Sequence, residues 1–227
     1  MSPSRIMLVH ALTESVAPIH RAFTAHWPEA TCFDLMDNSL SSDLAAAGEL
    51  TQSIRERFLT LGRYAANLSG DGGKTAGILF TCSAFQPAID AVKADLSLPV
   101  LRPNEAAFEA ALDTGRCIGL LVTFPPSLTA LTTELRGMAA ARGIEINLMA
   151  RNVDGALAAL KAGDGARHDA LVAEAAAEMH VDVLVLGQFS LARAAAAIAP
   201  VAGRTVLTTP DSAVRKMRQL VAAQRPS

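Results

Sequence analysis

The chain has 227 residues, a net charge of −2 and a pI near 6.2; 51% of it is apolar and only 4% aromatic. Such an aliphatic composition is typical of a layered helix–sheet protein. The balanced charge, without a Lys/Arg-rich block, argues against a nucleic-acid partner, and the longest apolar stretch, 194–202, is too short to span a bilayer. Three cysteines without a paired pattern, and no signal-peptide core at the N-terminus, favour a reducing cytoplasm.

Apolar runs alternate with helical patterns along the chain. Strands are expected at 6–10, 31–35, 78–80, 98–101, 117–123, 144–149, 181–186 and 204–208. Helices are expected at 13–26, 42–68, 84–95, 104–113, 125–141, 153–161, 167–179, from 190 onward, and at 211–223. This alternation predicts parallel sheets with right-handed crossover connections.

The pattern of strands and helices also repeats. Residues 5–10 match 118–123 in role, and 79–85 match 185–190. We therefore predict an α/β fold of two pseudo-symmetric lobes, each a parallel sheet flanked by helices, with the active cleft between them. The first lobe is expected to span 1–102 plus 209–227, and the second 103–208.

The segment around Cys82 carries the clearest chemical signal. The apolar run 78–80 ends at Thr81-Cys82-Ser83, and Pro87 then lies in the first turn of a helix. Because the free N–H groups and dipole at a helix N-terminus favour negative charge, we expect a stabilised thiolate there. Cys82 would then be a proton-transfer group beside a carboxylate pocket and the first cysteine to react with iodoacetamide. The alternative is that Cys82 is a small buried residue of the core.

Other chemical motifs are weak or absent. No glycine-rich dinucleotide fingerprint follows the first strand, and Gly73-Lys74-Thr75 precedes a strand, whereas a phosphate loop follows one. The five histidines lack metal-ligand spacing. His10 ends the first strand, so it is either a hydrogen-bonding group of the pocket or a satisfied structural residue. We expect neither a metal nor a cofactor.

Three segments carry a resemblance to a known family: Thr81-Cys82-Ser83-Ala84, Val122-Thr123-Phe124-Pro125 and Leu186-Gly187. Over nearly its whole length the chain resembles the aspartate/glutamate/hydantoin racemase superfamily, which includes maleate isomerases and arylmalonate decarboxylases. The resemblance implies cofactor-independent chemistry with one cysteine from each lobe on opposite faces of the substrate α-carbon. Here the residue after Gly187 is Gln188, which cannot act as a proton-transfer base.

The resemblance therefore implies isomerase- or lyase-type proton transfer next to a carboxylate, with Cys82 as the single catalytic cysteine. The expected substrate-binding residues come from both lobes: His10, Asn38, Ser83, Thr123, Gln188 and Ser190. Two alternatives stay open, namely a two-base racemase whose second acid is His10 or Ser190, and a carboxylate-binding protein without chemistry. The expected partner is a small carboxylate rather than a nucleic acid or a membrane, and a homo-oligomer is compatible with the sequence.

Overall fold

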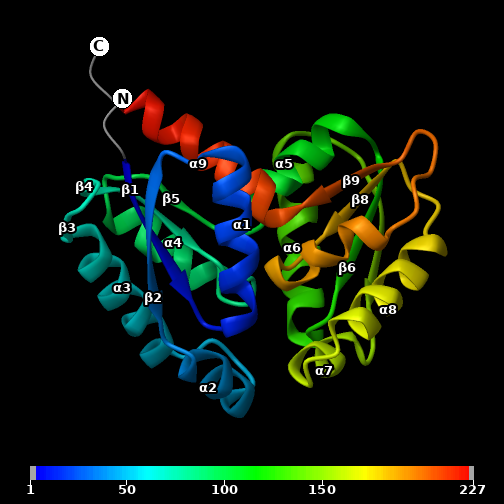
Figure 1. Ribbon diagram of the computed structural model, residues 1–227, viewed down its shortest axis with the longest axis horizontal. Helices are drawn as coiled ribbons and strands as arrows, with labels where there is room; N and C mark the ends of the chain where they lie inside the picture. The colour runs from blue at the N-terminus through cyan, green and yellow to red at the C-terminus, as the bar shows by residue number, and fades with distance from the viewer. Residues whose placement is uncertain (1–3, 225–227) are drawn as a thin grey trace. The chain divides into compact units, whose positions relative to one another are not determined.

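A computed structural model describes residues 4–224 and divides the chain into two compact units (Figure 1). Unit 1 contains Met1–Pro103 and Ala213–Ser227, and unit 2 contains Asn104–Ser212. Each unit has its own parallel sheet with helices packed against it, which confirms the predicted α/β class. Among the described residues, no helix is long and apolar enough to cross a membrane.

The sheet of unit 1 is built around its first strand. Its strands are β1 (Ser4–His10), β2 (Ala30–Met36), β3 (Ser69–Gly70), β4 (Gly73–Phe80) and β5 (Val100–Leu101). The parallel order is β2-β1-β4-β5, and β3 adds a short antiparallel pairing at the start of β4. All seven residues of β1 are buried, as expected for an apolar strand covered on both faces.

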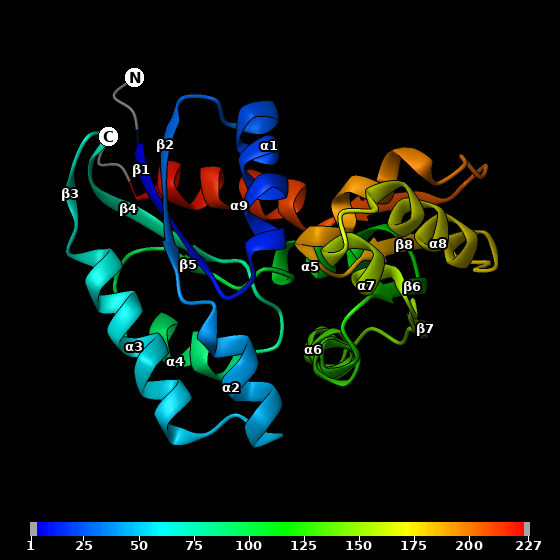
Figure 2. The ribbon, with the colours of Figure 1, turned by 60° about the horizontal axis from the view of Figure 1, so that its bottom comes forward.

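Helices cover both faces of this sheet (Figure 2). They are α1 (Val16–His26), α2 (Ser39–Ala47), α3 (Gln52–Ala66), α4 (Gln86–Asp95) and the closing helix α9 (Thr209–Ala223), with a short 3-10 turn at Thr13–Ser15. Helices α3 and α4 lie on one face, and α1 and α9 on the other. The aromatic centre of the core is Phe58, which packs against Phe80 and Phe85 with ring centroids 5.3 and 4.9 Å away.

The single helix expected over 42–68 is wrong: the structure has two helices, α2 and α3, with a break between them. Gly48 ends α2 with a φ of 70°, a left-handed conformation that glycine adopts without steric cost. Thr51 then caps α3, because its side chain accepts a hydrogen bond from the N–H of Ile54 at 3.3 Å.

Unit 2 holds a four-stranded parallel sheet. Its strands are β6 (Cys117–Val122), β7 (Asn147–Asn152), β8 (Val183–Leu186) and β9 (Thr205–Thr208), in the order β7-β6-β8-β9. Its helices are α5 (Glu105–Thr114), α6 (Pro125–Ala141), α7 (Ala156–Lys161) and α8 (Gly165–Ala177). The segment after β8, expected as a helix, is instead a 3-10 stretch over Phe189–Ala197.

The two units share one strand order, since β2-β1-β4-β5 corresponds to β7-β6-β8-β9. Backbone hydrogen bonds fix the equivalence: Thr81 N–H donates to Val9 (3.0 Å), as Gly187 N–H donates to Leu121 (2.9 Å). Val9 therefore corresponds to Leu121, and the alignment of 5–10 with 118–123 is off by one residue. The residue equivalent to His10 is Val122 rather than Thr123.

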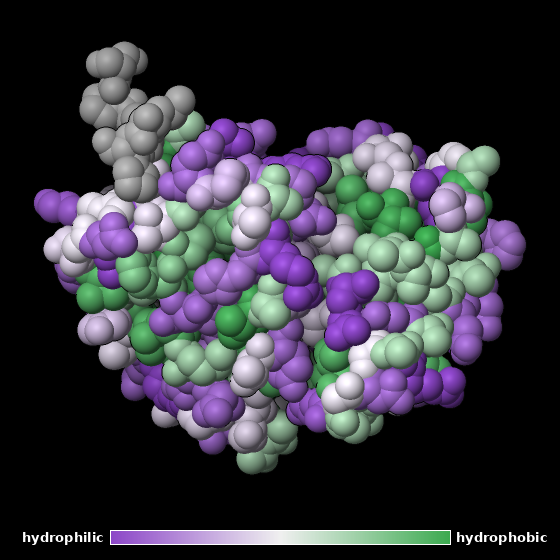
Figure 3. All heavy atoms as spheres, viewed as in Figure 1, coloured by the Kyte–Doolittle hydropathy of each residue, from purple (hydrophilic) through white to green (hydrophobic). Residues whose placement is uncertain are grey.

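Large apolar side chains that remain on the surface are scattered over separate elements. Met36 on β2, Tyr64 on α3, Met149 on β7 and Val201 before β9 are exposed. On the face shown in Figure 3, polar and apolar side chains are interspersed. Single exposed apolar residues of this kind are ordinary and do not by themselves indicate a docking partner.

Candidate functional site

The first element of the candidate site is the turn that follows β4, residues 81–85, which we call the Cys82 turn. The N–H of Thr81 continues the parallel pairing with β1, and α4 begins at Gln86 with Pro87 in its first turn. Phe85 is fully buried against Phe58. The turn is therefore anchored at both of its ends.

Cys82 is buried, with 8% of its surface exposed, and burial raises the pKa of its thiol to about 11. Hydrogen bonds with the backbone of Ala84 and the side chain of Ser41 oppose this rise without cancelling it. The expected stabilised thiolate is therefore wrong for this structure. The physical reason is that α4 begins four residues later, so desolvation outweighs the helix N-terminus.

Ser41 is a site residue that sequence reasoning missed. It lies on α2, donates from Oγ to the carbonyl of Ala11 at 2.9 Å, and also hydrogen-bonds to Cys82. The sequence carries no signal for this contact, because it joins residues that lie far apart in the chain. Asn38, the residue expected from this region, is exposed at the N-cap of α2 and makes no side-chain capping bond.

His10 lies at the end of β1 with both ring nitrogens engaged. Nδ1 is 2.8 Å from Thr81 Oγ1 and 3.1 Å from Ser15 Oγ, and Nε2 is 2.9 Å from Asp34 Oδ1. The ring is fully buried, and this burial lowers the pKa of His10, so it is neutral near neutral pH. Because a carboxylate only accepts, the ring proton belongs on Nε2, and Nδ1 accepts from the Thr81 hydroxyl.

This arrangement ties three neighbouring strands together at their carboxyl ends. His10 comes from β1, Asp34 from β2, and Thr81 directly follows β4. Asp34 also accepts hydrogen bonds from the half-exposed His20 of α1 at 2.9 Å. His10 therefore holds in place Thr81, the residue before Cys82. Ser83, on the other side of Cys82, is also buried.

The second element is the turn that follows β8, residues 187–190, which we call the Gln188 turn. Gln188 Oε1 accepts hydrogen bonds from the N–H of Thr123 at 2.6 Å and from its hydroxyl at 2.9 Å. Gln188 Nε2 donates to Ser127 Oγ at 3.4 Å. All three residues are buried, whereas Ser190 is half-buried in the 3-10 stretch. Thr123 and Gln188, both predicted from the sequence, therefore lie in direct contact.

The backbone of the Gln188 turn is held from two sides. Asn104 Nδ2 donates to the carbonyl of Gly187 at 2.6 Å, and the N–H of Gly187 donates to Leu121. A Cβ at position 187 would lie 2.7 Å from Leu120 Cδ1 and 3.0 Å from the Leu121 carbonyl, so a side chain there would require both neighbours to shift. Asn104 and Ser127 are further residues that the sequence did not single out.

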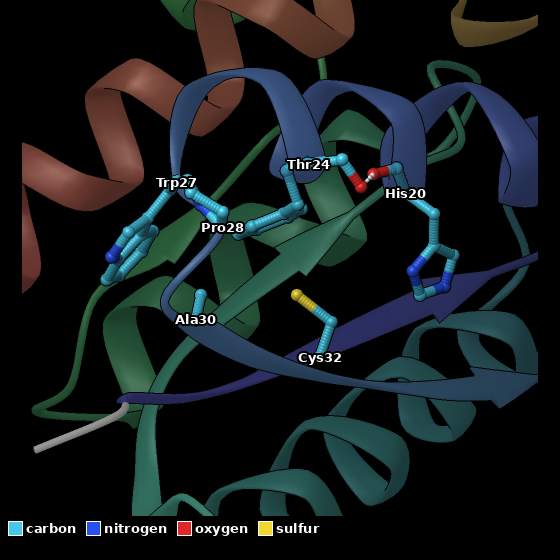
Figure 4. A pocket seen from close by; sticks show the side chains of 7 residues that line it. His20, Thr24, Trp27, Pro28, Ala30 and Cys32 are labelled. Atoms are coloured by element: carbon cyan, nitrogen blue, oxygen red, sulfur yellow. Dashed lines mark hydrogen bonds between the residues drawn. The ribbon is translucent and has the colours of Figure 1, made fainter.

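A pocket of about 250 Å³ lies between α1 and β2 in unit 1 (Figure 4). Its lining is His20, Phe23, Thr24, Trp27, Pro28, Ala30 and Cys32. Cys32 pairs in register with Ile6, and Ile6 pairs on its other side with Gly77. Gly77 lies five residues before Cys82, which at about 3.3 Å per residue is roughly 16 Å along the sheet. Burial and the nearby Asp34 raise the pKa of Cys32 to about 12, so it stays protonated.

The described residues contain no cluster of three or more His, Cys, Asp or Glu suited to a metal ion.

The sequence profile of the Asp/Glu/Hydantoin racemase family matches residues 9–217, which include both turns. The chain belongs to this family. No curated protein sequence matches the chain. Solved structures of racemases share the fold of this chain. Their sequence identities to it are so low that the comparison establishes the fold alone.

One similar structure is the glutamate racemase isoform RacE1 from Bacillus anthracis, with a TM-score of 0.72 and 12% identity over 99% of this racemase-family chain and 84% of that one. The allantoin racemase from Klebsiella pneumoniae has a TM-score of 0.68 and 19% identity, over 97% of this chain and 88% of that one. The aspartate racemase from Picrophilus torridus has a TM-score of 0.69 and 11% identity, over 96% of this chain and 94% of that one. Family membership makes this chain an isomerase-type protein.

Proposed function

We propose that this chain catalyses proton transfer at the carbon next to a carboxylate of a small substrate, without a cofactor, and that Cys82 is its single acid–base group. The observation that carries the proposal is the place of Cys82. It follows the carboxyl end of β4, where ligands bind in parallel α/β folds, within the segment that matches the racemase family. Ser83 and the backbone N–H groups of the Cys82 turn would hold the carboxylate.

The raised pKa of Cys82 favours one direction of the chemistry. A thiol with a pKa of about 11 keeps its proton near neutral pH, so the free protein offers Cys82 as a proton donor. In a lyase-type step, the bond to a departing carboxylate breaks, carbon dioxide leaves, and the electron pair remains on the α-carbon as an enediolate. Cys82 Sγ–H then protonates that carbon, and the resulting thiolate regains a proton from water.

The position equivalent to Cys82 in unit 2 argues against symmetric two-base racemisation. Gln188 occupies it, and an amide does not ionise in this pH range. His10, one of the two candidate second acids beside Ser190, is fully buried with both ring nitrogens engaged. A one-sided reaction, in which Cys82 alone transfers the proton, fits these residues better.

A second candidate function is a small-carboxylate-binding protein without chemistry. The observation that favours it is the same raised pKa of Cys82 together with the unionisable Gln188. Incubation with a panel of amino acids and substituted malonates in deuterated water separates the candidates. A racemase introduces deuterium at the α-carbon with the carboxylate retained, a lyase releases carbon dioxide, and a binding protein does neither. Cys82→Ala should slow either reaction by about 10²–10⁴, and a near-native rate in this variant would contradict the proposal.

A further inference from the structure

Two hydrogen-bond donors of Thr123 converge on one oxygen, and that oxygen belongs to Gln188. The backbone N–H lies 2.6 Å and the hydroxyl 2.9 Å from Gln188 Oε1. Paired donors aimed at a single acceptor are how proteins bind a carboxylate oxygen or an oxyanion. Thr123 also lies just before α6, whose dipole adds to the preference for negative charge. The side-chain carbonyl of Gln188 thus occupies the place of a ligand oxygen.

The orientation of the Gln188 amide follows from its partners. With Oε1 on the two Thr123 donors, Nε2 faces the Ser127 hydroxyl, which can accept. The flipped amide would direct its N–H groups at the backbone N–H of Thr123, which can only donate, and this is electrostatically unfavourable. Gln188 is 9% exposed and Thr123 is 4% exposed, so donors without an acceptor there would be costly.

The main chain holds Gln188 in this position as well. Its carbonyl accepts from the N–H of Leu191 at 3.0 Å, and the preceding Gly187 is fixed by Asn104 and Leu121. The contact with Thr123 is therefore set by the backbone on both sides of Gln188. A free ligand must displace an acceptor that is already tethered at the site, which lowers its affinity.

We infer that Gln188 is a specificity-determining residue that closes the Thr123 donor pair to carboxylates. The use of this selectivity on a substrate rests on the proposed function, but the closed donor pair is a property of unit 2 alone. Replacing Gln188 with a small residue should strengthen carboxylate binding at Thr123.

The test is a titration of the full ¹⁵N-labelled chain with sodium acetate, followed at the backbone amide resonance of Thr123. In the native protein this resonance should show no saturable shift at millimolar acetate. In Gln188→Ala and Gln188→Ser it should saturate, with acetate bound at least about tenfold more tightly, as expected for hydrogen bonds to a charged acceptor. Gln188→Glu keeps an acceptor on Thr123 and Gln188→Met fills the space, so both controls should behave as the native chain.

Two results would overturn the inference. One is a native chain that binds acetate at Thr123 as tightly as Gln188→Ala, because the donor pair would then be open. The other is a Thr123 resonance that stays silent in both small-residue variants, because the pair would then not bind carboxylates. The readout requires no turnover, so failure of the proposed catalysis at Cys82 would leave this result standing.

Discussion

The two units end their equivalent strands with the same backbone bond and with different chemistry. Thr81 and Gly187 make the same N–H contact to the neighbouring strand, and the next residues are Cys82 and Gln188. In unit 1 a titratable thiol lies beside a His10–Asp34 network, whereas in unit 2 a neutral amide is held by Thr123. The repeat thus retains the geometry of a strand end, while only unit 1 has an ionisable residue at this position.

The largest effect that this comparison predicts is on turnover. Cys82→Ala should lower kcat by about 10²–10⁴, because it removes the proton-transfer group. Gln188→Ala should change turnover only several-fold, since it alters hydrogen bonds worth about 1 kcal/mol each. Cys117→Ala, at the start of β6, is the matched control and should behave as the native chain. Near-native turnover of Cys82→Ala would remove the basis of the comparison.

The second prediction concerns thiol reactivity. With a pKa of about 11 against a reference of 9.0, Cys82 should have about 100-fold less thiolate than a free cysteine at neutral pH. Its alkylation by iodoacetamide should be correspondingly slow and should rise about tenfold per pH unit up to pH 11. Peptide mapping of alkylated protein gives the rate at each pH. A rate that levels off below pH 9 would show that Cys82 is an activated thiol after all.

The third prediction concerns the network that only unit 1 possesses. His10→Ala removes a partner from the buried hydroxyls of Thr81 and Ser15 and should lower the free energy of unfolding by about 1–3 kcal/mol. His180→Ala, an exposed histidine of unit 2, should change it by less than about 0.5 kcal/mol. Urea unfolding of the three proteins measures both changes, and equal effects of the two variants would contradict a structural role for His10.

The same residue predicts a pH dependence of folding. The pKa of His10 is lowered from 6.5 in the folded state, so the unfolded chain binds more protons. Its stabilising contribution is present above pH 6.5 and is lost as the pH falls below that value. Asp34 and His20 are the titratable groups coupled to this ring. His10→Ala should therefore lose less stability than the native chain on acidification, and an unchanged acid sensitivity would count against this assignment.

The smallest predicted effect is at Asn104 in unit 2. Asn104→Ala removes the hydrogen bond to the Gly187 carbonyl, but it also removes Asn104 Oδ1, which has no partner within residues 4–224. Loss of the hydrogen bond destabilises the fold, and removal of the unpartnered oxygen partly offsets this loss. The free energy of unfolding should therefore fall by about 1 kcal/mol. Amide exchange at Gly187 and Gln188 should nevertheless become faster. Asn147→Ala, at the exposed start of β7, is the control, and unaltered exchange in Asn104→Ala would contradict the role of Asn104.

The parts of the fold that follow from local pattern were predictable from the sequence. The apolar strands and their alternation with helices gave the parallel α/β class, and the matched segments gave the repeated strand order. The break at Gly48 was missed because the apolar periodicity continues across it, and a glycine within a helical pattern does not always end the helix. The one-residue error between His10 and Val122 arose because both strands end in similar apolar runs, and only inter-strand hydrogen bonds fix the register.

Long-range side-chain contacts were the part that the sequence could not supply. Cys82 was correctly placed at a strand end, but its pKa depends on burial and on Ser41, which is 41 residues away in the chain. Gln188 was identified as the replacement for a second cysteine, yet its bonds to Thr123 depend on how β6 and β8 are paired. No local pattern specifies such contacts, because they follow from tertiary packing.

The most direct test of the central claim, that Cys82 alone transfers the proton, is chiral chromatography of the product formed in deuterated water. The account predicts a single deuterated enantiomer from the native chain and product formation about 10²–10⁴-fold slower by Cys82→Ala. Complete racemisation by the native chain, with Cys82→Ala still active, would contradict the assignment of Cys82 as the sole proton-transfer group.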